Sequence, residues 1–140
     1  MTVPMVLLPV FVLVALAFVL LLSLAPIRAA ALRSGKVDVA AVALDDRQWH
    51  GRAQQFGNAF KNQFEVPVLF YALVALALIT RQTDFLFVAL SWVFVASRLV
   101  HAFIHVTSNN IGVRGPAFGF GVLVLAVMWI IFAVRILASA

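Results

Sequence analysis

An apolar run from residue 3 to residue 27, without a single charged side chain, is the feature that most limits how this chain can fold. A helix needs about 20 apolar residues to cross the hydrocarbon core of a bilayer, so the run predicts a transmembrane helix. No basic residue precedes the run, and it is longer than the apolar core of a signal peptide, which has about 7–15 residues. We therefore expect it to be retained as a membrane span.

Three further spans follow along the chain. The stretches 85–106 and 117–137 are long enough by themselves, whereas the stretch 66–80 is too short and must be extended back to residue 56. The extended helix runs past Pro67, which removes one backbone hydrogen bond and is expected to kink it. The sequence thus predicts a single transmembrane domain, 1–140, folded as an all-α four-helix bundle with spans at about 3–27, 56–80, 85–106 and 117–137.

Composition and charge support a lipid environment. Charged residues make up 11% of the chain and hydrophobic residues 65%, whereas average soluble domains carry about 25% charged residues. Six of the ten basic residues lie in the first connection and the start of the next helix: Arg28, Arg33, Lys36, Arg47, Arg52 and Lys61. Short connections rich in Lys and Arg stay cytoplasmic, so we expect the long basic loop in the cytoplasm, both termini on the opposite side, and no nucleic-acid partner.

Two polar stripes converge at the cytoplasmic end of this bundle. Asn58, Asn62 and Glu65 follow i, i+4, i+7 spacing and would share one face of the second helix. Arg98, His101 and His105 follow i, i+3, i+7 spacing on the third helix, near its cytoplasmic end. The residues Arg28, Arg52 and Arg114 come from segments that bound the same end. Because ionisable groups inside a membrane are costly, such a cluster predicts a functional site.

Other interpretations of the cluster remain open. Glu65 and Arg98 could simply neutralise each other, with the amides and imidazoles joining helices. A zinc site on His101 and His105 would need Glu65 or an asparagine as third ligand, with Arg98 repelling the cation; we expect no metal, and the chain has no cysteine to supply one. A transport path is weaker still, because polar groups gather at one end only.

The two stripes resemble the motifs of the MAPEG family, the membrane-associated proteins of eicosanoid and glutathione metabolism. The segment 62–67 (NQFEVP), with Asn58 one turn earlier, resembles the start of the family's second helix. Arg98, His101, His105 and the downstream Arg114 resemble its third-helix motif and the loop after it. The resemblance implies a homotrimer of four-helix subunits, like the microsomal glutathione transferases, with glutathione bound between subunits near the cytoplasmic side.

The resemblance also implies roles for the motif residues. Asn58, Asn62 and Glu65 would lie at the tripeptide, Glu65 at its amino group, while Arg28, Arg98 and Arg114 would meet its carboxylates or thiolate. We take Arg114, His101 and His105 as the catalytic candidates and the others as glutathione-binding candidates. Two departures are plain: Asn58 stands where glutathione-using members have arginine, and histidines stand where they have tyrosines.

Two functions therefore follow from the resemblance. The first is a glutathione-dependent transferase or peroxidase that takes lipophilic small molecules from the membrane. The second is a non-catalytic protein of the same fold that binds lipid or serves as an accessory of a larger membrane complex. Membrane lipid is an expected partner in both cases.

Overall fold

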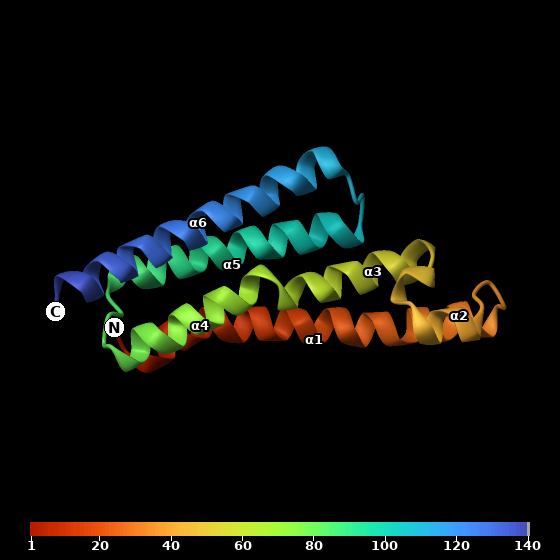
Figure 1. Cartoon of the computed structure of the whole chain (residues 1–140), viewed down its shortest axis with the longest axis horizontal. Helices are drawn as coiled ribbons and strands as arrows, with labels where there is room; N and C mark the ends of the chain where they lie inside the picture. Colours follow the sequence, from red (N-terminus) through yellow and green to blue (C-terminus); the bar gives the residue numbers. More distant parts are fainter. Residues whose placement is uncertain (140) are drawn as a thin grey trace.

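Four long antiparallel helical segments form the molecule, and both termini lie at the same end of it (Figure 1). The structure is a computed structural model that describes residues 1–139. In chain order the elements are α1 (Val3–Arg33), α2 (Val39–Leu44), η1 (Asp46–Gln48), α3 (Gly51–Lys61), η2 (Asn62–Phe64), α4 (Val66–Ile79), α5 (Phe85–Val106) and α6 (Ile111–Ala138), where η marks a short 3₁₀ helix.

Four of these helical segments are long and apolar enough to cross a membrane: Val3–Arg33, Gly51–Ile79, Phe85–Val106 and Ile111–Ala138. The second therefore starts at Gly51 rather than at residue 56. The fourth starts at Ile111 rather than at residue 117, because the Asn110 side chain caps the helix by accepting a hydrogen bond from Gly112 N at 2.9 Å. Pro116 is accommodated inside its first turns.

The second span is interrupted rather than continuous. Helix α3 passes into η2, and Glu65, with φ −97° and ψ −106°, separates η2 from α4. Pro67 lies in the first turn of α4, where its missing N–H has no partner to lose. The kink expected from Pro67 is confirmed, and it takes the form of a change in helix type. Because the helical register ends at Glu65, residues on either side of it no longer share one face.

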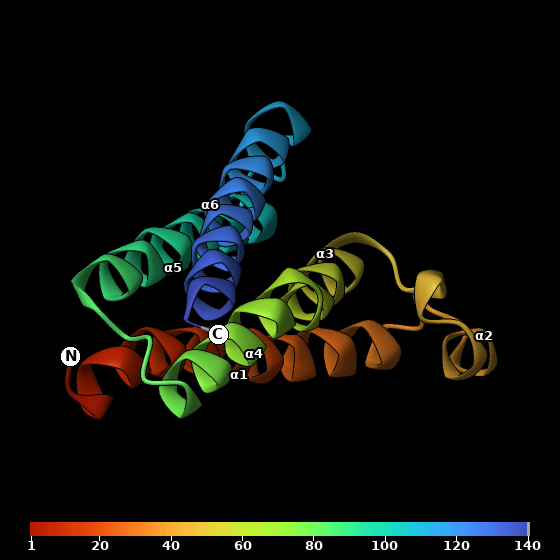
Figure 2. The ribbon, with the colours of Figure 1, turned by 60° about the vertical axis from the view of Figure 1, so that its left-hand side comes forward.

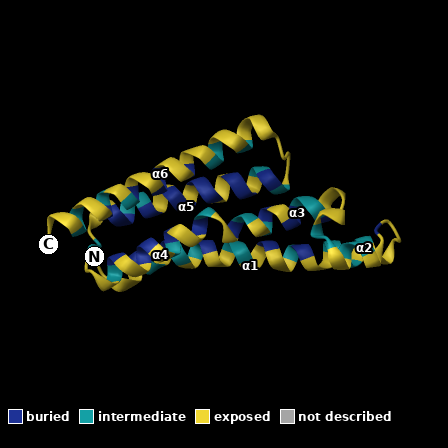
Figure 3. Cartoon of the chain, viewed as in Figure 1, coloured by how far each residue is buried: buried dark blue, intermediate teal, exposed yellow. Residues whose placement is uncertain are grey.

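Helix α5 is the central element of the bundle, whereas α1 and α6 leave broad apolar faces exposed (Figure 3). The core is made by side chains from all four spans, among them Leu13, Phe70, Leu73, Phe94, Val95, Leu125 and Met128. Outward-facing side chains on α1 and α6 include Phe18, Leu22, Leu123 and Ile130. A surface of this kind is stable in lipid and not in water, so the fold is that of a multi-pass membrane protein.

The connection between α1 and α3 projects beyond the four-helix bundle (Figure 2). A small apolar cluster of Val37, Trp49 and Ala53 holds this connection against Ile27 and Ala31 at the end of α1. The connection therefore packs at the level where the apolar part of α1 ends.

Candidate functional site

Arg98 is the most deeply buried charged residue in the part of the chain that the structure describes. Its side chain is 0% exposed on α5. One guanidinium nitrogen, Nη2, donates to Asn62 Oδ1 at 2.6 Å, while Nε and Nη1 have no partner. The guanidinium carbon lies 5.4 Å from the ring centroid of Phe118 on α6. Arg98 thus joins α5 to η2 through one hydrogen bond, and its Nε and Nη1 donors remain unused.

Two buried imidazoles continue the polar face of α5 beyond Arg98. His101 and His105 are each 3% exposed, and their ring centroids lie 5.6 Å apart. His101 also lies 5.5 Å from the ring of Phe118. The Nδ1 atom of each histidine lacks a partner among the described residues. Buried ring nitrogens of this kind can donate or accept a proton or hydrogen bond once a ligand is present.

Close approach of α6 to α5 at the cluster depends on Gly121. A Cβ atom placed there would lie 2.6 Å from Ser97 Oγ and 3.7 Å from Arg98 Cδ. A Cβ atom at the exposed Gly115 or Gly119 would, by contrast, meet nothing within 4 Å in the same subunit.

The second span contributes only Asn62 to this cluster. Glu65 is exposed and forms no direct ion pair within residues 1–139, although its negative charge still attracts the Arg98 guanidinium at longer range. The backbone leaves the helical conformation at Glu65, so this residue is not buried beside Asn62. Asn58 is also exposed, and its Oδ1 lies 2.8 Å from Gln54 Nε2.

Arg28 lies in a separate ion-pair network at the base of the long connection. Its Nη2 contacts Asp46 Oδ1 at 2.7 Å, and its guanidinium stacks 4.7 Å from the Trp49 ring. Lys61 pairs with the other Asp46 oxygen. The hydrogen bond from Lys61, followed by the charge of Arg28, holds the pKa of the Asp46 carboxyl below its usual value of 3.8. The sequence analysis missed Asp46, the acidic residue that lies among these basic ones.

The outer edge of the cluster is formed by α3 and the connection between α5 and α6. Gln55 Nε2 donates to the backbone oxygens of His105 at 2.7 Å and Thr107 at 3.2 Å, which ties α3 to the end of α5. Sequence analysis missed Gln55, although it extends the Asn58 stripe by one turn and could have been found there. Arg114 is half-buried and its guanidinium donates to Asn109 Oδ1.

The described residues contain no group of three histidine, cysteine, aspartate or glutamate side chains that could hold a metal ion. The structure brings Arg98, His101, His105 and Asn62 together. Arg114 and Glu65 lie at the edge of this group, close enough for their charges to act on it, and Arg28 and Asn58 lie outside. We name the first four the Arg98 cluster.

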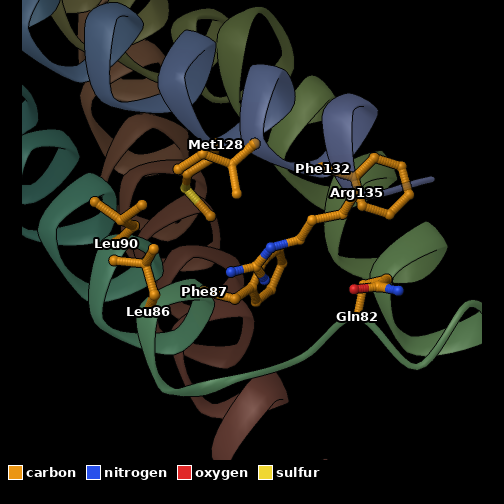
Figure 4. Close-up of a pocket in the computed structure, with 8 residues that line it drawn as sticks. Gln82, Leu86, Phe87, Leu90, Met128, Phe132 and Arg135 are labelled. Atoms are coloured by element: carbon orange, nitrogen blue, oxygen red, sulfur yellow. The ribbon is translucent and has the colours of Figure 1, made fainter. Parts of the chain in front are cut away.

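A small cavity at the other end of the bundle has a different character (Figure 4). It is lined mainly by apolar side chains of α5 and α6, with Gln82 and Arg135 at its edge. Arg135 Nη2 forms an ion pair at 2.7 Å with Asp84, and that carboxylate also caps α5 by accepting from Phe87 N. The Arg135 guanidinium at the edge of the cavity is thus already engaged in a structural ion pair.

Comparison with known families gave one result that covers nearly the whole chain: a model of the MAPEG family matches residues 6–134. Comparison with curated proteins and with solved structures gave no match. The match spans all four membrane helices, η2 and the Arg98 cluster. The chain is a membrane protein of the MAPEG family.

Proposed function

We propose that this protein binds glutathione at the Arg98 cluster and uses its thiol to conjugate or reduce lipophilic molecules that arrive from the bilayer. The observation that carries the proposal is the state of Arg98. It is a fully buried cation whose nearest polar partner is a neutral amide, and two of its three nitrogens are unused.

A buried charge without a counter-charge is strongly destabilising, and in a membrane it is retained mainly for function. An anion suits the two unused nitrogens of Arg98 best. A guanidinium binds carboxylates through two parallel hydrogen bonds, and glutathione carries two carboxylates. Asn62 beside it could bind the peptide groups of the same molecule.

The chemistry follows from the same residues. A cation close to the thiol favours the nucleophilic thiolate, and the thiol proton can pass to an imidazole of His101 or His105. In conjugation, the sulfur forms a bond to an electrophilic carbon, and the leaving group departs with the electron pair. In reduction of a hydroperoxide, the thiolate attacks oxygen and releases the alcohol, and a second glutathione then yields the disulfide and water.

The assembly and its orientation belong to the proposal as well. Glu65 is a carboxylate exposed on the surface of a single subunit within the second span. An ionised group cannot face lipid tails at low cost, which supports a homotrimer in which neighbouring subunits cover Glu65 and bring it to the glutathione amino group. Arg28, Asn58 and Arg114 would border this site. We place the basic loop in the cytoplasm and both termini on the opposite side.

A non-catalytic role is the second proposal. It is favoured by the engagement of Arg28 with Asp46 and Trp49, which removes one cation from the expected glutathione set. In this proposal the Arg98 cluster binds another anionic amphiphile, such as a fatty acid, or the protein serves as an accessory of a larger membrane complex.

Calorimetric titration of the detergent-purified protein with glutathione tests the first proposal. We expect saturable binding by the native protein and a loss of at least tenfold in affinity for Arg98→Met, since a charged hydrogen-bond donor contributes about 1.5–3 kcal/mol. Arg33→Met, which removes an exposed arginine outside the cluster, should bind normally.

Three results would decide between the two proposals. Conjugation of a lipophilic electrophile by the native protein and not by Arg98→Met supports the enzyme. Absence of glutathione binding to the native protein overturns it. Binding of a fatty acid that requires Arg98, without binding of glutathione, supports the non-catalytic role.

A further inference from the structure

A surface hollow lies where the end of α1 meets the start of α3, beside the connection that projects from the bundle (Figure 2). Its floor is apolar and consists of Ile27 and Ala31 of α1, Val37 of the connection and Ala53 of α3. These residues belong to the apolar cluster that packs the connection against α1, so the shape of the floor is fixed by the fold. None of the residues that line the hollow belongs to the Arg98 cluster. We call it the connection hollow.

The rim of the connection hollow is basic. Lys36, His50 and Arg52 line it, and all three side chains are exposed. Neither Lys36 nor Arg52 forms an ion pair within residues 1–139. No acidic residue of this part of the chain lines the hollow, since Asp45 and Asp46 pair with basic residues outside it. Two cations are therefore free to bind an anion at this rim.

The level of the connection hollow in the membrane follows from α1. The uncharged run 3–27 extends about 37 Å as a helix with a rise of about 1.5 Å per residue, which exceeds the hydrocarbon core of about 30 Å. The part of α1 that lines the hollow, between Ile27 and Ser34, begins where this run ends. On the second span, a Cβ atom at Gly57 would lie 3.0 Å from Arg28 Nη2, and Arg52 lies more than a turn before Gly57. Both walls of the hollow are thus at the level of the lipid head groups.

We propose that the connection hollow binds the head group of an anionic phospholipid, with the lipid phosphate paired to Lys36 and Arg52. A guanidinium binds phosphate through parallel hydrogen bonds, and an ammonium binds it as a point charge. The glycerol region of the lipid contacts the apolar floor, and the acyl chains continue along the exposed apolar surface of α1.

Two features select this ligand over others that carry phosphate. Free inorganic phosphate would lose water at the apolar floor without gaining contacts there. A zwitterionic phospholipid would bring its own cationic group to a basic rim. Basic pockets on the cytoplasmic side of membrane helices bind anionic head groups, and we place the connection on that side. The site does not depend on glutathione.

Native mass spectrometry of the full chain in detergent tests the proposal, with equimolar phosphatidylglycerol and phosphatidylcholine of the same acyl chains as probes. We expect the native protein to retain phosphatidylglycerol about 25-fold better, because each basic residue at the membrane surface contributes about fivefold. Lys36→Gln and Arg52→Gln should each lower this preference about fivefold, and the double variant should bring it close to one. Both side chains are exposed and without ion pairs, so the variants should fold.

Matched variants separate the hollow from general basicity. Arg33→Gln removes a neighbouring exposed arginine that does not line the hollow and should change the preference by less than about twofold. Ala30→Trp fills the hollow while every charge is kept, and it should lower phosphatidylglycerol binding at least about fivefold. Ala25→Trp, the same change at an exposed position of α1 outside the hollow, should have no effect.

The proposal is overturned if the native protein shows no preference, or if the preference survives in the double variant. It is also overturned if Arg33→Gln lowers the preference as much as Lys36→Gln, because net charge alone would then select the lipid. Addition of inorganic phosphate, with chloride at the same ionic strength as the reference, should not displace phosphatidylglycerol. Displacement by phosphate would show that the site takes a soluble anion and would overturn the assignment to a lipid.

Discussion

Replacing Asn62 by leucine removes the hydrogen-bond partner that the structure gives to the buried Arg98 guanidinium. The bond is 2.6 Å long, Arg98 is 0% exposed, and its other two nitrogens have no partner to compensate. A hydrogen bond to a charged group contributes about 1.5–3 kcal/mol, and a buried charge left unpaired costs about 3–5 kcal/mol. We expect Asn62→Leu to lower the free energy of unfolding by about 2–4 kcal/mol.

The measurement is a denaturant titration in detergent, followed by helical circular dichroism, on four proteins that form a double-mutant cycle. Arg98→Met should be neutral or stabilising in the absence of ligand, because an apolar side chain of similar size replaces an unpaired charge. The double variant should resemble Arg98→Met, which gives a coupling energy of about 1.5–3 kcal/mol.

Asn58→Leu is the matched control, since Asn58 is exposed one turn earlier on α3. It should change the free energy of unfolding by no more than about 0.5 kcal/mol. If Asn62→Leu is no more destabilising than this control, or if the cycle shows no coupling, Arg98 has another partner and our account of the cluster is wrong.

Three further predictions concern packing, pH and the exposed carboxylate. Gly121→Ala should cost about 1–3 kcal/mol of unfolding free energy, because its Cβ would meet Ser97 Oγ at 2.6 Å. Gly119→Ala, which meets nothing within 4 Å, should stay within about 0.5 kcal/mol, and equal effects would contradict the packing. The two cations paired with Asp46 lower its pKa in the folded state below 3.8. The stabilising contribution of the Asp46 carboxylate is therefore complete above about pH 4, and it is lost as the pH falls through the folded pKa. The melting temperature of Asp46→Asn should therefore fall less steeply below pH 4 than that of the native protein, and parallel curves would argue against the network. In the absence of glutathione, Glu65→Gln should leave the unfolding free energy unchanged or raise it, because it removes a charge that neighbouring subunits would cover without an ion-pair partner in the same subunit. It should weaken glutathione binding at least tenfold by calorimetry, and unchanged binding would remove Glu65 from the site.

Much of the architecture follows from local properties of the chain. The run from residue 3 to 27 and the stretch 85–106 are apolar over most of their length, so hydropathy alone predicts helices there, and α5 has the bounds Phe85–Val106. Proline removes a backbone donor wherever it stands, which is why the interruption near Pro67 could be expected. Helical periodicity also brings Arg98, His101 and His105 onto one face of α5, and all three are buried there.

Contacts between segments needed the tertiary structure. Periodicity assigned Glu65 to the face of Asn62, but the backbone at Glu65 leaves the helical conformation and exposes the carboxylate. Asp46 could not be paired with Arg28 and Lys61 from sequence, because the fold of the connection decides which of several basic residues it meets.

The sequence by itself determined a four-span helical membrane protein with MAPEG motifs and an interruption near Pro67. The tertiary structure alone decided that Asn62 is the partner of Arg98 and that Gly121 allows the close approach of α6 to α5. The physical reason is that solvent preference and helical period are properties of a single segment. The partner of a buried charge depends on how two segments are rotated against each other, and the departure of ψ at Glu65 to −106°, from about −42° in an α-helix, changes that rotation.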